Sequence, residues 1–168
     1  MDLRELQAEY LRQQREVTDE RIAIGALIRT VLSEAYGLTF KNGRKEKPKR
    51  LIVIGVDHES ALCFGSVLVY TNMNPQARFS AEYLTAQYEL KQEDYPEFMD
   101  YNSYVDCGEL LSIPIDRLKQ GEFFGFLNDA DREGIFDILE TSDIFSTKQK
   151  KRYGIRRSIM HPKNENKK

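Results

Sequence analysis

Two neighbouring apolar runs constrain the fold of this chain more than any other feature of its sequence. RLIVIGV runs from Arg50 to Val56, and ALCFGSVLVYTN runs from Ala61 to Asn72. Both runs are short and rich in β-branched and aromatic residues, which is typical of buried strands. The four polar residues between them, DHES, favour a turn, and Pro75 ends the second run. The sequence therefore predicts two consecutive strands joined by a turn.

Further short strands are expected on both sides of this pair. LTF (38–40) precedes it, and YLTAQYEL (83–90) alternates apolar and polar residues as a half-buried strand does. SYVDC and LLSIPI have the composition of two short strands around Gly108. Asn128 is the expected N-cap of a last helix. Five or six short strands followed by a helix predict a mainly β, α+β fold with a small, strongly bent sheet or barrel.

The N-terminal part of the chain is predicted to be helical. Apolar residues recur at helical spacing over 3–17, and a wider apolar stripe follows over 21–35. Thr18 is expected to cap the second of these helices. Three parts of the chain are therefore expected: an N-terminal helical extension (1–36), a barrel domain (37–147) and a basic, partly disordered tail (148–168).

The net charge of −2 hides an uneven distribution of charged residues. Residues 148–168 contain nine Lys or Arg and one acidic residue, so the remaining 147 residues carry a net charge of −10. A second basic segment, KNGRKEKPKR (41–50), leads directly into the first apolar run, and its Pro48 is expected to bar regular strand pairing. We expect such a protein to bind a polyanion only locally, at these basic segments.

Several classes of protein and site do not fit the sequence. No stretch approaches the roughly 18 apolar residues of a membrane-spanning helix. The N-terminal residues lack the apolar core of a signal peptide, so we expect a cytoplasmic protein with no membrane partner. Cys63 and Cys107 lie in apolar runs, where buried reduced thiols are favoured although pairing is possible.

Few residues have the spacing of a catalytic centre. His58 and His161 are the only histidines, and they show no metal-ligand spacing, so neither a metal nor a cofactor is expected. Asp106 and Glu109 are interpreted as turn residues rather than as a catalytic pair. The chain also lacks a Gly-rich phosphate loop and a G-x-S-x-G motif. Any catalysis is therefore expected to work without a histidine base.

Three segments, in this order along the chain, resemble the MazF/PemK family. KRLIVIGV followed by SVLVYTN is similar to the family's second and third strands, of which the first opens with an Arg and the other ends near a Thr or Ser. SYVDCGELLSIPIDRL (103–118) resembles its later strand pair, and GFLNDADREGIFDIL (125–139) resembles its closing segment. The resemblance covers residues 37–145.

The resemblance implies an SH3-like barrel, a homodimer and a toxin with a partner antitoxin protein. Members of the family cleave single-stranded RNA without a metal, leaving a cyclic phosphate and a 5′-hydroxyl. By the same resemblance Arg50 and Thr71 are the catalytic residues, and the guanidinium would stabilise charge on the phosphoryl oxygens. The basic residues expected to bind flanking phosphates of the RNA are Lys41, Arg44, Lys45, Lys47 and Lys49.

Departures from the family keep other interpretations open. Leu51 stands where the family has a Pro after the Arg, and the acidic stretch QEDYPEFMD (92–100) would repel RNA if it lay near the groove. The alternative is therefore a non-catalytic RNA-binding or protein-interaction module on the same fold. Inhibition of DNA gyrase, which is the action of the related CcdB toxins, is a third hypothesis.

Overall fold

The computed structural model describes the whole chain except residues 1, 37, 39–42, 44, 71–80 and 156–168. Its strands are β1 (Ala26–Ser33), β2 (Glu46–Asp57), β3 (Leu62–Tyr70), β4 (Gln87–Leu90), β5 (Ser103–Asp106), β6 (Leu111–Pro114) and β7 (Glu122–Phe126). Its α-helices are α1 (Leu3–Arg15), α2 (Ala81–Thr85), α3 (Ile115–Leu118), α4 (Asp129–Thr141) and α5 (Thr147–Tyr153). Within the described residues, three single 3₁₀ turns lie at Asp19–Arg21, Glu34–Tyr36 and Gln92–Asp94.

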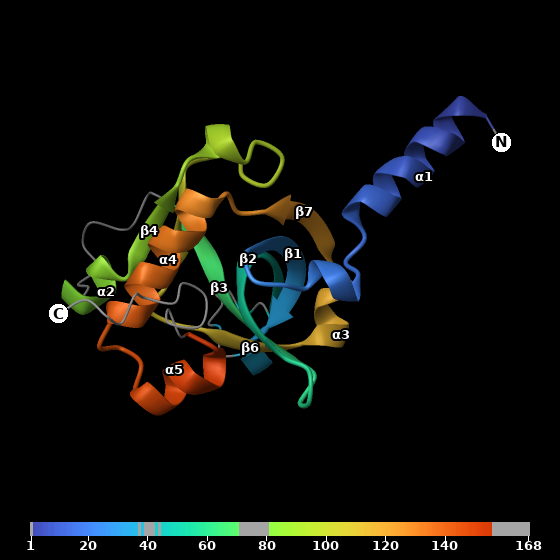
Figure 1. Cartoon of the computed structure of the whole chain (residues 1–168). Coiled ribbons are helices and arrows are strands. Elements are labelled where there is room, and N and C mark those ends of the chain that lie inside the picture. The colour runs from blue at the N-terminus through green and yellow to red at the C-terminus, as the bar shows by residue number, and fades with distance from the viewer. Residues whose placement is uncertain (1, 37, 39–42, 44, 71–80, 156–168) are drawn as a thin grey trace, which may run out of the picture.

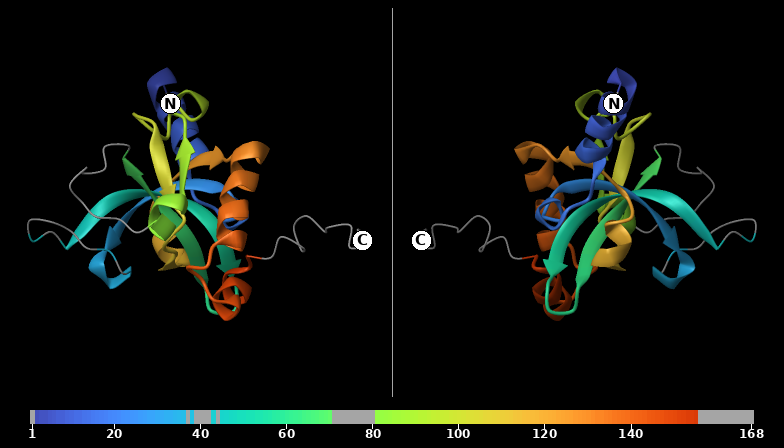
Figure 2. Two further views of the ribbon diagram at one scale, coloured as in Figure 1. Left: turned by 90° about the vertical axis from the view of Figure 1, so that its left-hand side faces the viewer. Right: turned by 90° about the vertical axis from the view of Figure 1, so that its right-hand side faces the viewer.

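The strands form one antiparallel sheet, which confirms the α+β class. Their order is β4-β5-β3-β2-β1-β7, and β6 also pairs with β3. The long strands β1 and β2 curve strongly through the middle of the molecule (Figures 1 and 2). The sheet is bent but does not close into the expected barrel, because the strands at its two ends, β4 and β7, do not pair within the described residues.

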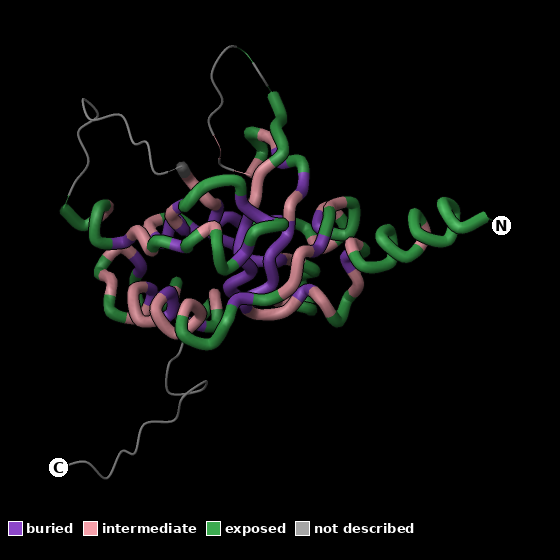
Figure 3. Tube along the Cα trace, turned by 90° about the horizontal axis from the view of Figure 1, so that it is seen from above, coloured by how far each residue is buried: buried purple, intermediate pink, exposed green. Residues whose placement is uncertain are grey.

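Apolar clusters bury both faces of the sheet. Side chains of β2 alternate between them, because successive residues of a strand point to opposite faces. Ile52 and Ile54 contact the cluster that includes α4, and we call this side the α4 face. Leu51 and Val53 contact the cluster that includes Leu118 of α3, and we call this side the α3 face. Figure 3 shows the buried residues gathered in the central strands between these two layers.

Residues 26–33 form a strand and not part of the predicted helix over 21–35. β1 lies between β2 and β7, with Leu27 in the cluster on the α4 face and Ile28 in the cluster on the α3 face. A central strand that is covered on both faces is apolar almost throughout, and these apolar residues also happen to fit helical spacing. Thr18 makes no side-chain capping bond and precedes only a 3₁₀ turn. The sheet therefore includes part of the predicted helical extension 1–36.

Two further strand predictions need correction. Pro48 lies inside β2, opposite Val31, although a regular ladder was not expected there. Among the described residues only β1 pairs with this end of β2, and a strand that is paired on one side tolerates a proline. The segment 83–90 contains the end of α2 and all of β4 instead of one strand, and β7 is an additional strand that was not predicted.

The C-terminal part of the domain agrees better with the sequence. Asn128 is the N-cap of α4, since its Oδ1 accepts a hydrogen bond from the Asp131 backbone N–H at 2.8 Å. The start of the predicted disordered tail is instead helix α5. Its Tyr153 ring packs against Phe64, with 4.9 Å between ring centroids, and Ile155 is buried after it. Residues 156–168 lie outside the described part.

Cys63 and Cys107 are buried free thiols, which confirms the favoured interpretation of both residues. Burial raises the pKa of Cys63 to about 12 and also raises the pKa of Cys107. No helix in the described part of the chain has both the length and the apolar character needed to cross a membrane.

Candidate functional site

The candidate site centres on Arg50, the last residue of the basic segment 41–50. Alternation along β2 places Arg50 on the α4 face, one position beyond the buried Ile52 on that face. Its side chain is 27% exposed, and its Nη2 lies 3.5 Å from Oδ2 of Asp100. The Asp100 side chain is 73% exposed. The guanidinium is therefore held in place by the sheet, whereas its carboxylate partner is largely in solvent.

A small cavity of about 50 Å³ lies beside Arg50. Its walls come from the start of β2, the middle of β3 and the segment that enters β5: Lys47, Pro48, Lys49, Arg50, Leu68, Val69, Met99, Asp100 and Ser103. Typical ligand pockets are roughly 300–1,000 Å³. This cavity therefore has room for a small anionic group but not for a nucleobase.

The structure does not bring the predicted phosphate-binding residues to one face. Alternation along β2 directs the Lys47 and Lys49 side chains to the α3 face, opposite to Arg50, although both residues border the same small cavity. Burial lowers the pKa of Lys49, and the neighbouring charge of Lys47 lowers it further. Lys45 is exposed in the bend just before β2. Thr71, Lys41 and Arg44 lie outside the described residues, so their predicted roles stay predictions.

Arg50 belongs to a row of charges that crosses the sheet. Its register partner on β1 is Arg29, and the register partner of Arg29 on β7 is Glu122. Nη1 of Arg29 lies 3.4 Å from Oε1 of Glu122. Like charges opposite one another in a sheet repel. Arg29 is paired with Glu122 and Arg50 is paired with Asp100. The order of the charged residues is therefore Glu122, Arg29, Arg50 and Asp100.

Asp100 and Ser103 are site residues that the sequence analysis missed. The stretch 92–100 carries four acidic residues, and this composition was the available signal. The structure places the end of this stretch against Arg50, so an acidic group does lie beside the predicted catalytic side chain. Ser103 is buried, and its hydroxyl donates to the Tyr101 carbonyl at 3.1 Å. That bond holds the chain in position as it enters β5.

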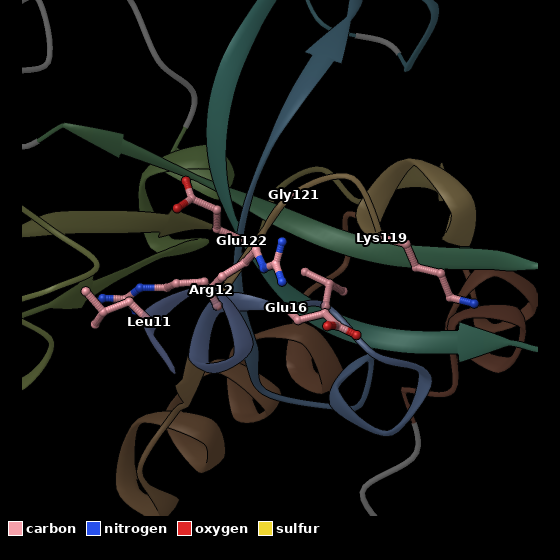
Figure 4. A pocket seen from close by; sticks show the side chains of 8 residues that line it. Leu11, Arg12, Glu16, Lys119, Gly121 and Glu122 are labelled. Carbon is pink, nitrogen blue, oxygen red and sulfur yellow. The ribbon is translucent and has the colours of Figure 1, made fainter. Parts of the chain in front are cut away.

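A cavity of about 620 Å³ lies between α1 and the start of β7 (Figure 4). Its lining residues combine both signs of charge with apolar groups: Leu11, Arg12, Arg15, Glu16, Val17, Lys119, Gly121 and Glu122. Figure 4 shows the Arg12 and Lys119 side chains well separated, with Glu16 between them. This set contains no nucleophile with a neighbouring base, so it does not form a catalytic centre.

Two other polar clusters have structural roles. Asp106 accepts hydrogen bonds from Gln87 Nε2 at 2.9 Å and from the Gly108 N–H at 3.0 Å, as expected of a turn residue. Burial, and then the charge of Asp106, raise the pKa of Glu109.

His58 is exposed. No group of three or more His, Cys, Asp or Glu among the described residues could hold a metal.

The second cluster joins α4 to the strands. Asp131 Oδ1 accepts from the Tyr88 hydroxyl at 2.8 Å, and its Oδ2 accepts from the Tyr95 hydroxyl at 2.5 Å. The Tyr95 oxygen in turn accepts the Asn128 N–H at 3.1 Å. This cluster fixes the start of α4 against β4 and the segment after it.

Comparison of the chain with models of known protein families found no match, and comparison with curated proteins found none either.

Proposed function

We propose that this chain is a metal-independent endoribonuclease that cleaves single-stranded RNA, as the toxin of a toxin–antitoxin pair. The observation that supports this best is the Arg50 guanidinium beside a small cavity, paired with an exposed carboxylate. Exposed ion pairs contribute little to stability. A phosphate that makes paired hydrogen bonds to the guanidinium can therefore replace Asp100.

The chemistry follows from the charge that Arg50 can stabilise. The ribose 2′-oxygen attacks the adjacent phosphorus, a P–O2′ bond forms, and the P–O5′ bond breaks. The 2′-hydroxyl gives up its proton, and the departing 5′-oxygen gains one, so the products are a 2′,3′-cyclic phosphate and a 5′-hydroxyl. Arg50 stabilises the negative charge on the non-bridging oxygens. Since DNA has no 2′-hydroxyl, the reaction is specific for RNA.

The other parts of the proposal extend this site. Thr71 supplies a hydroxyl that orients the reacting groups, and the lysines of the basic segment bind phosphates farther along the RNA. Lys47 and Lys49 lie on the α3 face, so RNA that contacts them as well as Arg50 passes around the end of β2. The proposal also includes a cytoplasmic location, a homodimer and a partner antitoxin.

The decisive test compares Arg50→Ala with Arg29→Ala. Both residues are arginines on neighbouring strands, and each is paired with a carboxylate, so the two variants lose the same charge. The assay incubates a long single-stranded RNA with each protein in EDTA and analyses the ends of the fragments. We expect wild type and Arg29→Ala to give discrete cuts with cyclic-phosphate ends, and Arg50→Ala to give none. Equal cleavage by both variants would refute the role of Arg50.

A non-catalytic RNA-binding or protein-interaction module is the second candidate. The position of Asp100 favours it, since a carboxylate beside Arg50 opposes the approach of a phosphate. In that case the wild-type protein binds RNA in a fluorescence anisotropy titration but leaves it intact. Asp100→Asn should then tighten binding without producing cleavage, whereas under the ribonuclease proposal it should also change the cleavage rate.

A further inference from the structure

An aromatic cavity with an acidic rim lies at the end of β7. It has a volume of about 470 Å³, which is in the range of sites that bind ligands. It shares no lining residue with the Arg50 cavity. The lining residues that matter here are four aromatic rings and two carboxylates: Tyr95, Phe98, Phe124, Phe126, Asp94 and Glu97.

Three of the four rings are fixed by the fold. The Phe98 and Phe124 rings pack against each other, with 5.4 Å between centroids. The Tyr95 hydroxyl is held between Asp131 and the backbone of Asn128. Tyr95 and Phe98 are both buried, so the base of the cavity is preorganised.

The fourth ring, Phe126, is presented by a bulge in β7. The register against β1 shifts between Phe123 and Phe126, and Gly125 between them has φ +112°. Only glycine adopts such a backbone conformation without strain. Bulges commonly redirect side chains at functional sites. Phe126 lines the cavity and is 47% exposed, and its ring is in edge contact with Phe123.

The same walls already bind a cation from inside the molecule. The Arg15 guanidinium lies over the Phe124 ring at 4.1 Å from its centroid, and its Nη2 lies 2.8 Å from Oε2 of Glu97. Phe124 and Glu97 also line the aromatic cavity, so a cation is held by one ring and one carboxylate of the set. Asp94 and Phe126 also line the cavity and are exposed, and no hydrogen bond or ion pair reaches the Asp94 carboxylate from the described residues.

We propose that this cavity binds an arginine or lysine side chain from a basic segment of a partner protein. The faces of aromatic rings attract cations, and the Asp94 carboxylate adds direct ion pairing. A polyanion would be repelled by Asp94, and a purely apolar group would leave that carboxylate without a partner, whereas Glu97 is already paired with Arg15. The inference stands independently of the proposed ribonuclease activity.

The test titrates the full chain with a heptapeptide of alternating glycine and arginine and measures binding by calorimetry. A matched peptide has citrulline in place of each arginine, because citrulline keeps the shape of the side chain but carries no charge. We expect the arginine peptide to bind and the citrulline peptide to bind at least threefold more weakly. Loss of one ring or one carboxylate, in Phe126→Ala or Asp94→Asn, should weaken arginine-peptide binding about threefold to tenfold.

Glu93→Gln is the matched control, because Glu93 is an exposed neighbour of Asp94 that does not line the cavity. It should leave the affinity unchanged. Equal weakening by Glu93→Gln and Asp94→Asn would mean diffuse attraction to an acidic surface and would overturn the proposal. Equal binding of the two peptides, or tighter binding of a single-stranded RNA that depends on Phe126, would also overturn it. Asp94 and Phe126 are exposed, so an unchanged thermal unfolding midpoint checks that each variant folds.

Discussion

Helices α1 and α4 are both 13 residues long and both begin with a side-chain N-cap, yet only α4 belongs to the core. Asp2 caps α1 in a reciprocal arrangement with Glu5. α4 buries three side chains, whereas α1 buries none. Figure 1 shows α1 pointing away from the molecule and α4 lying across the sheet.

The comparison separates what starts a helix from what makes it contribute to global stability. At the sixth position α1 has Ala8, a strong helix former, and α4 has Gly134, a weak one. A Cβ at Gly134 would lie 2.3 Å from Cε2 of Tyr88. At this position α4 has the residue with the lower helix propensity, yet α4 is the helix that packs closely on the sheet.

The largest expected effect comes from truncating a buried residue of α4. Ile135 is fully buried, so Ile135→Ala should reduce the free energy of unfolding by about 2–5 kcal/mol. Leu6 of α1 is 53% exposed, so Leu6→Ala should change it by less than about 0.5 kcal/mol. Urea unfolding followed by circular dichroism measures both. A similar loss in both variants would show that α1 also belongs to the cooperative core.

Substituting the sixth residue should change global stability in α4 but not in α1. Gly134→Ala should destabilise the protein by about 1–3 kcal/mol through the clash with Tyr88, although alanine favours the helix itself by about 1 kcal/mol. Ala8→Gly should lower the helical content and leave the urea midpoint unchanged. A stabilising Gly134→Ala would mean that the Tyr88 ring moves aside at little cost.

The contact between Tyr88 and Asp131 of α4 should make the stability of the protein depend on pH in the alkaline range. Burial, and then the hydrogen bond to Asp131, raise the pKa of Tyr88 to about 12, above the value of about 10 for an unfolded tyrosine. The folded protein therefore holds this proton more tightly, and the stabilisation is complete below about pH 10 and is lost as the pH rises through about 12. Tyr88→Phe should show a smaller fall in the urea midpoint over this range. Identical curves for wild type and Tyr88→Phe would contradict the prediction.

The smallest expected effect concerns the caps. Asn128→Ala should reduce the free energy of unfolding by about 1 kcal/mol, because the Asp131 N–H loses its partner. Asp2→Ala removes an equivalent bond but should only increase hydrogen exchange in the first turn of α1. Equal shifts of the urea midpoint would show that α1 is coupled to the core.

The candidate site could be predicted only in part. Arg50 was named because RLIVIGV resembles a family strand that opens with an Arg, and the basic segment 41–50 leads into that run. The sequence did not indicate Asp100 as the partner of Arg50, since the two lie 50 positions apart in the chain. Only strand pairing between β3 and β5 brings them together. The distribution of the basic residues over two faces could not be read from the sequence either. It depends on β2 continuing through Pro48, which local propensity disfavours.

The sequence by itself determined the α+β class, the two strands of the central hairpin, the pair of short strands around Gly108 and the start of α4. These features depend on local signals: apolar runs, turn residues and a capping side chain. The tertiary structure alone decided that residues 26–33 are a strand, because these residues are apolar on both faces and only the neighbours β2 and β7 distinguish that strand from a helix. It also decided that α1 stays exposed while α4 is buried, since burial depends on where a helix meets the sheet and not on how the helix begins.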